Sequence, residues 1–171
     1  MPRMSLMKRL FARDPDPKDA LRPLWHRIVE LSRAPAWYAD HGMADTVQGR
    51  FDMITLVLAM VLLRMEREDR LKPGSVYLIE LFVDDMDGQL RETGMGDPTL
   101  GKQMGRLVSV LGGRLGALRE AGRDVGAVGD VVARNCAVDD RGRALAAHLV
   151  ALAQKLDADD ADAILAGAIA R

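Results

Sequence analysis

The spacing of apolar positions along the chain predicts helices almost throughout. Apolar residues recur every three or four positions, and no segment alternates apolar and polar residues as a half-buried strand would. After a short helix over residues 4–12, about seven helices are predicted, over residues 17–33, 45–68, 75–93, 99–122, 124–135, 140–156 and 160–170. We therefore expect an all-α, bundle-like fold, with one compact domain over residues 16–171 and a basic amphipathic segment over residues 1–15.

Residues that favour helix ends divide these segments. Asp16 is expected to cap the first long helix with Pro17 at its first position, while Pro23 bends that helix or delays its start. Pro73-Gly74 is expected to precede the fourth segment, and Gly112-Gly113 to interrupt the fifth. The acidic residues predicted to cap the later helices are Asp97, Asp124, Asp140 and Asp160.

The segment over residues 45–68 is apolar nearly all round, which predicts a central, fully packed helix. The sequence has 10 methionines, whose unbranched side chains repack easily against different partners. Those predicted to lie in the core are Met53, Met60 and Met65. Those predicted to line an adaptable groove are Met43, Met86, Met95 and Met104.

Composition narrows the class of protein. The 171 residues are 49% hydrophobic and 29% charged, as in globular proteins, and the net charge of −1 disfavours a DNA partner. The single cysteine, Cys136, excludes an internal disulfide and is expected to be a small buried residue near a helix end. The longest nearly unbroken apolar run, residues 53–63, is shorter than the ~20 residues of a membrane span. We expect a cytoplasmic protein.

Charge is distributed unevenly, and the first 13 residues hold four basic side chains and no acidic one. A short helix of this composition can lie in an anionic membrane surface, and the alternatives are a frayed tail or a helix packed on the domain. The residues of this predicted membrane contact are Leu6, Lys8, Arg9, Leu10 and Phe11.

An acidic cluster occupies residues 84–87. On a helix, Asp84 and Asp87 share a face with Arg91, which favours pairing of Asp87 with Arg91, whereas Asp85 points elsewhere and is expected to be partly buried beside Arg50. Two carboxylates without a histidine are an incomplete ligand set for a transition metal, so no metal is expected. The candidate basic partners on the next helix are Lys102, Arg106 and Arg114.

No pattern in the chain indicates an enzyme or a cofactor. The three histidines lie far apart and outside metalloprotease spacings, and the glycine pairs do not follow a strand as nucleotide-binding loops do. His26, next to Trp25, is expected to be a partly buried packing residue.

Three short segments in order resemble a known family: QGRFDM at residues 48–53, LFVDDMDGQLR at 81–91, and GMGD at 94–97 followed by Gly101-Lys102. Their order and spacing are similar to those of the ubiquinol–cytochrome c chaperone family. The resemblance spans residues 19–116, is strongest over 48–106, and fades beyond residue 122.

The resemblance implies an all-helical, non-enzymatic assembly factor for cytochrome b, and thus for ubiquinol–cytochrome c reductase, in a bacterial cytoplasm. It implies the cytochrome b polypeptide as client, with the ribosome or a small partner subunit as further partners. A basic N-terminal helix would then hold the protein peripherally on the inner membrane. The charged residues predicted to form a client-binding rim, or to lock helix packing around a groove, are Arg50, Asp52, Asp84, Asp85, Asp87, Arg91, Asp97 and Lys102.

Two other functions remain open from the residues alone. A helical pocket could bind quinone, lipid or haem, with His26 as the haem ligand, although 4% aromatic residues disfavour a planar ligand. A helix-turn-helix DNA-binding protein is indicated only by Arg106, Arg114 and Arg119 beside glycines, and the net charge disfavours it.

Overall fold

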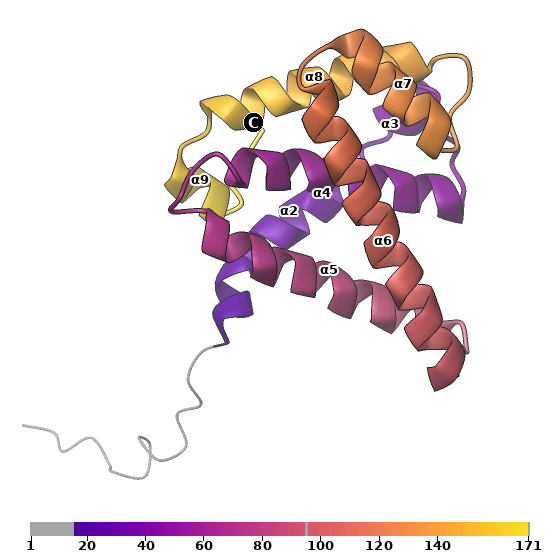
Figure 1. The fold of residues 1–171 in the computed structure, drawn as a ribbon, viewed down its shortest axis with the longest axis vertical. Coiled ribbons are helices and arrows are strands. Elements are labelled where there is room, and N and C mark those ends of the chain that lie inside the picture. The colour runs from indigo at the N-terminus through magenta and orange to yellow at the C-terminus, as the bar shows by residue number, and fades with distance from the viewer. Residues whose placement is uncertain (1–15, 95, 171) are drawn as a thin grey trace, which may run out of the picture.

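The computed structural model of the chain describes residues 16–94 and 96–170, and these residues are helical over most of their length (Figure 1). The elements are a 3₁₀ helix η1 (Pro17–Leu21) and the α-helices α2 (Arg22–Ser32), α3 (Ala36–Ala39), α4 (Val47–Met65), α5 (Lys72–Glu92), α6 (Asp97–Ala121), α7 (Val125–Asn135), α8 (Gly142–Ala158) and α9 (Ala161–Leu165). Within the described ranges no strand is present. The predicted all-α fold is confirmed. The predicted helix over residues 4–12 and its membrane-contact residues lie outside the described residues.

Helix α4 is the centre of the domain, as its apolar sequence predicts. It packs against α2, α5, α6 and α8 and lies between α8 and α5 in Figure 1. Met53, Met60 and Met65 are buried in the core, together with most other residues of α4. A helix surrounded on all sides has no polar face to present to water, which explains why its hydrophobic periodicity is weak.

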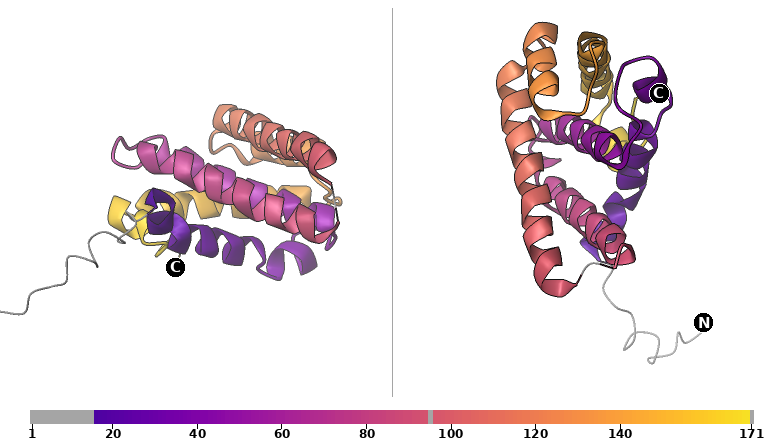
Figure 2. Two further views of the ribbon diagram at one scale, coloured as in Figure 1. Left: turned by 90° about the horizontal axis from the view of Figure 1, so that it is seen from below. Right: turned by 90° about the vertical axis from the view of Figure 1, so that its right-hand side faces the viewer.

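Helix α6 runs along one side of the molecule, from α7 to the end of α5 (Figure 2). Its inner face carries Leu100, Leu111, Arg114 and Leu118, all buried. The expected interruption at Gly112-Gly113 is wrong, because α6 continues through both glycines. Both glycines face open space, since a methyl group added at either one would meet no atom within 4 Å. Packing of the inner face outweighs the low helix propensity of glycine.

Three predicted caps are confirmed. The side chains of Asp16, Asp124 and Asp160 accept hydrogen bonds from backbone N–H groups in the first turns of η1, α7 and α9. The effect of Pro23 is a delayed start, because regular α-helix begins only at Arg22. Proline in a first turn removes an N–H that has no partner within the helix, so it marks a helix start at little energetic cost.

Three predicted boundaries are wrong. Pro73 lies within the first turn of α5, which begins at Lys72 rather than at Ser75. Gly96, not Asp97, is the residue that precedes α6, and Arg141 rather than Asp140 precedes α8. In each case the helix starts without a side-chain cap, so local cap residues do not decide the boundary.

The loop before α4 joins the connection between α7 and α8. Met43 and Val138 form an isolated antiparallel bridge, and the Ala44 N–H donates to the Ala137 carbonyl at 2.9 Å. Gly49 lies so close to this loop that a Cβ there would meet the Ala44 carbonyl oxygen at 1.8 Å. The glycine of the QGRFDM segment therefore permits a backbone contact that a side chain would block.

Candidate functional site

An apolar groove of about 410 Å³ lies where α4, α5 and α6 meet. Its lining residues are Ser32, Arg33, Val47, Gln48, Arg50, Phe51, Ile54, Met86, Gln89, Leu90, Thr93, Gln103 and Leu107. Most of its polar side chains are neutral amides and hydroxyls, two are arginines, and no acidic side chain lines it. Val47 at its edge is 89% exposed, which is unusual for a large apolar residue.

Residues that carry the family resemblance build this groove. One wall comes from the QGRFDM segment at the start of α4, and the second from the end of the LFVDDMDGQLR segment on α5. Met86 is 6% exposed yet lines the groove, as predicted, whereas Met43 is wrongly assigned to it, being buried in the core. Met104 is half-buried and packs against the core, and Met95 lies outside the described residues.

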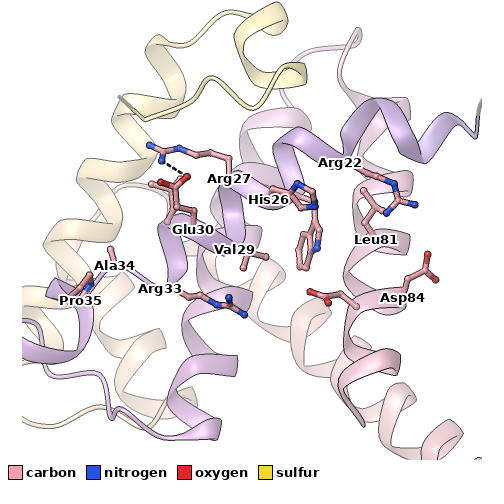
Figure 3. Close-up of a pocket in the computed structure, with 13 residues that line it drawn as sticks. Arg22, His26, Arg27, Val29, Glu30, Arg33, Ala34, Pro35, Leu81 and Asp84 are labelled. Carbon is pink, nitrogen blue, oxygen red and sulfur yellow. Dashed lines mark ion pairs between the residues drawn. The ribbon is translucent and has the colours of Figure 1, made fainter. Parts of the chain in front are cut away.

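A larger open trough of about 1090 Å³ lies between α2 and α5 (Figure 3). Arg22, His26 and Arg33 line its α2 side, and Asp84 and Asp85 line the α5 side. Its floor includes apolar side chains of both helices. The Arg33 side chain lines both the trough and the apolar groove, so the two hollows adjoin. Together they form one continuous face, called here the groove–trough face.

Four of the eight predicted rim residues are both exposed and ion-paired, namely Arg50, Asp84, Arg91 and Asp97. The predicted pair of Asp87 with Arg91 is present at 2.7 Å, and Arg91 also contacts Asp97 at 2.9 Å. Lys18 donates to Asp84 at 2.8 Å, and this hydrogen bond raises the pKa of the Lys18 ammonium.

The predicted pairing of this acidic cluster with basic residues of the next helix is wrong. Lys102 and Arg106 make no ion pair within the described residues, and Arg114 is buried elsewhere. Asp85 is half-buried, as expected, but Arg50 pairs with Asp45 at 2.8 Å instead of with Asp85. The reason is position: Arg50 lies in the first turn of α4, directly after the loop that carries Asp45, and it does not line the trough.

Asp52 is buried rather than part of a surface rim. Its carboxylate accepts from Arg114 Nη2 at 2.6 Å, from Gln48 Nε2 at 2.9 Å and from the Ala137 N–H at 2.8 Å. The side chains of Asp52 and Arg114 are only 1% and 4% exposed. Of the two roles predicted for this residue, locking the helix packing is the one that fits a buried position.

Arg114 is the functional partner that sequence reasoning misses. The charge pattern predicts it as a partner of the acidic cluster of α5, yet it lies on the apolar stripe of α6, three residues after Leu111 and four before Leu118. A charged residue in register with a buried stripe signals a buried ion pair. Besides Asp52, the Arg114 guanidinium donates to the Asn135 carbonyl at 2.5 Å and to the Thr55 hydroxyl.

The remaining candidates have no catalytic arrangement. His26 is exposed beside the trough, so its expected packing role is wrong. Cys136 lies at the end of α7, as predicted, but it is half-buried and not fully buried. This burial raises the pKa of its thiol to about 11. A thiol with so high a pKa is a poor nucleophile near neutral pH. Over residues 16–94 and 96–170, no three histidine, cysteine or acidic side chains gather as metal ligands would.

Comparison with known proteins places these features in a family. The family described as Ubiquinol-cytochrome C chaperone matches residues 39–171. The crystal structure of the Cbp3 homolog from Brucella abortus is similar, with a TM-score of 0.79, 27% identity and 96% of each chain covered. No individual curated protein sequence matches significantly.

The family match corrects the extent of the sequence resemblance. The match to the family continues through α7, α8 and α9 to residue 171. The resemblance found in the sequence alone fades beyond residue 122. The family match supports a chaperone role in complex assembly and, with it, a non-enzymatic role. None of the helices that the structure describes combines the length and the apolar character needed to cross a membrane.

Proposed function

We propose that this chain, which belongs to the ubiquinol–cytochrome c chaperone family, assists assembly of ubiquinol–cytochrome c reductase by binding the cytochrome b polypeptide non-covalently. The observation that carries this proposal is the apolar groove, because residues of the family-like segments build it. The client binds on the groove–trough face, with its apolar helix in the groove and its polar flank over the trough.

The groove has the chemistry that an unassembled membrane helix needs. A helix bound in a groove is anchored by apolar side chains at i, i+3, i+4 and i+7, and Phe51, Ile54, Met86, Leu90 and Leu107 form a surface for such anchors. Met86 adds a side chain that repacks easily. Phe51 is the one aromatic lining residue, so the groove offers no aromatic cage for a flat quinone or haem.

The exposed charges of α5 position the client in this proposal. Asp84 and Asp85 line the trough from α5, and Arg22 and Arg33 line its α2 side, so a client segment in the trough meets charges of both signs. Charges of this kind change association and orientation more than affinity. Binding takes place in the cytoplasm or peripherally at the inner membrane, where the client inserts.

Deletion of the gene in its host tests the function. We expect the reduced-minus-oxidised spectrum of membranes to lose its b-type haem signal together with quinol–cytochrome c reductase activity, while other membrane complexes remain. Reintroduction of the wild-type gene should restore both. An unchanged b-type signal would contradict cytochrome b as the client.

The role of the charged trough is tested with Asp85→Ala. If Asp85 positions the client, less cytochrome b co-purifies with the tagged protein, while the melting temperature stays unchanged. The matched control is Asp130→Ala, which removes an exposed acid from α7, away from the groove–trough face. A large fall in melting temperature for Asp85→Ala would instead indicate a structural role.

A further inference from the structure

We propose that Gln48 is a specificity-determining residue of the apolar groove, and that the buried Asp52–Arg114 pair orients its amide to present a hydrogen-bond acceptor to the client. The occupant is then an apolar helix that carries a hydrogen-bond donor, such as a serine or threonine hydroxyl, on its bound face. This inference rests on the proposed client-binding function and names the chemistry that the groove selects.

The orientation of the Gln48 amide follows from its neighbour. The two ends of a glutamine amide differ in chemistry, because the NH₂ group donates and the carbonyl oxygen accepts. An ionised carboxylate only accepts, so the Asp52 carboxylate, 2.9 Å away, binds the NH₂ end. The carbonyl oxygen accepts no hydrogen bond from a described residue, and because Gln48 is exposed and lines the groove, this oxygen is free to accept from a client.

The Asp52 carboxylate is itself held in place. Arg114 binds one oxygen at 2.6 Å and the Ala137 N–H binds the other at 2.8 Å, so rotation would break contacts at both ends. Arg114 also lies 5.8 Å from the centre of the Phe51 ring, a lining residue of the same groove. Asp52 and Arg114 are therefore positioning residues, which set one polar and one apolar contact of the groove wall.

The charges of the groove disfavour one class of occupant. Its charged lining residues, Arg33 and Arg50, are both cationic and no acid lines it, so a basic segment is repelled. A neutral apolar helix suffers no such repulsion, and when it covers the groove it removes the Gln48 carbonyl from water. An acceptor buried without a partner is unfavourable, so a client helix lacking a donor at this position is discriminated against by about tenfold.

The test compares an amide of the groove with an amide away from it. Tagged full-length protein is purified from host membranes, and the bound cytochrome b is measured for the wild type, Gln48→Leu and the matched control Gln154→Leu. Gln154 is exposed on α8, away from the groove–trough face, and no hydrogen bond joins its side chain to a described residue. We expect Gln48→Leu to lower recovery about tenfold and Gln154→Leu to leave it within about twofold, with equal melting temperatures. Equal recovery for both variants would overturn the inference.

A crosslinking experiment identifies the contact without altering Gln48. A photoreactive residue replaces Val47, which is exposed at the edge of the groove, and the crosslinked client segment is read by mass spectrometry. The inference expects an apolar segment with a serine, threonine or other donor within one turn of the crosslink. A segment without any donor would overturn it. If wild-type protein recovers no cytochrome b at all, the proposed function fails and this inference fails with it.

Discussion

Two charged regions of the molecule look alike in the sequence and differ in the structure. Asp52 lies in one family-like segment and Asp87 in another, each with an arginine partner. The Asp52–Arg114 pair is 1% and 4% exposed, whereas Asp87 and Arg91 are 35% and 54% exposed. The first pair joins α4 to α6, and the second lies along α5 alone.

This difference in burial determines what each pair does. A buried ion pair loses its hydration, so it is tolerated only if hydrogen bonds replace the water, and the Asp52 carboxylate has three such partners. An exposed pair keeps most of its hydration and contributes little to stability. The buried pair therefore acts on structure, and the exposed cluster remains available to a client.

The largest expected change in stability is that caused by Asp52→Ala. It leaves the Arg114 guanidinium buried without its counter-ion, and a loss of this kind lowers the free energy of unfolding by about 3–5 kcal/mol. Urea unfolding followed by circular dichroism measures it. Asp84→Ala, on the exposed cluster, serves as the control and should leave the urea midpoint nearly unchanged. Equal losses in the two variants would remove the distinction between the regions.

Replacing both members of the buried pair sharpens the comparison. The double variant Asp52→Leu/Arg114→Met removes both charges at once and leaves neither unpaired, so we expect it to regain most of the stability that Asp52→Ala loses. The same urea titration gives the result. If the inference about Gln48 is correct, this stable variant still recovers less cytochrome b, because the carboxylate that orients the amide is absent.

A smaller effect is expected for Asp87→Ala on the exposed cluster. It removes one of the two carboxylates that Arg91 contacts, and the remaining contact with Asp97 keeps the arginine paired. The shift of the urea midpoint should be small and should vanish at 1 M salt, because salt screens exposed charges. A shift that persists at high salt would show that packing, rather than charge, connects this region to the core.

The smallest effect concerns a third region, where the rings of His41 and His148 stack with centroids 3.7 Å apart. Burial, and then the charge of His148, lower the pKa of His41 below its ordinary value of 6.5. The unfolded chain therefore takes up a proton before the folded one does, and stability falls as the pH drops through about 6.5. Melting temperatures from pH 8 to 5.5 measure the fall, which should be smaller in His148→Ala.

Features that depend on residues close together in the sequence can be predicted from the sequence. The apolar spacing predicted the helices, Asp16, Asp124 and Asp160 were recognisable as caps, and the apolar run at residues 53–63 marked the central helix. The three wrong helix starts, those of α5, α6 and α8, belong to helices that begin without a side-chain cap. Their starts follow from tertiary packing, which no local pattern records.

The sequence by itself determined the helical class and the position of the central helix, because each depends on residues within a few turns of one another. It also determined the resemblance to the family, which depends on the order and spacing of short segments. Only the tertiary structure decided which charges are buried. Asp52 meets Arg114 across 62 positions and the Ala137 N–H across 85. Such contacts exist only after α4, α6 and the connection between α7 and α8 have packed, and that packing removes water from Asp52 while leaving Asp84 and Asp87 exposed or half-exposed.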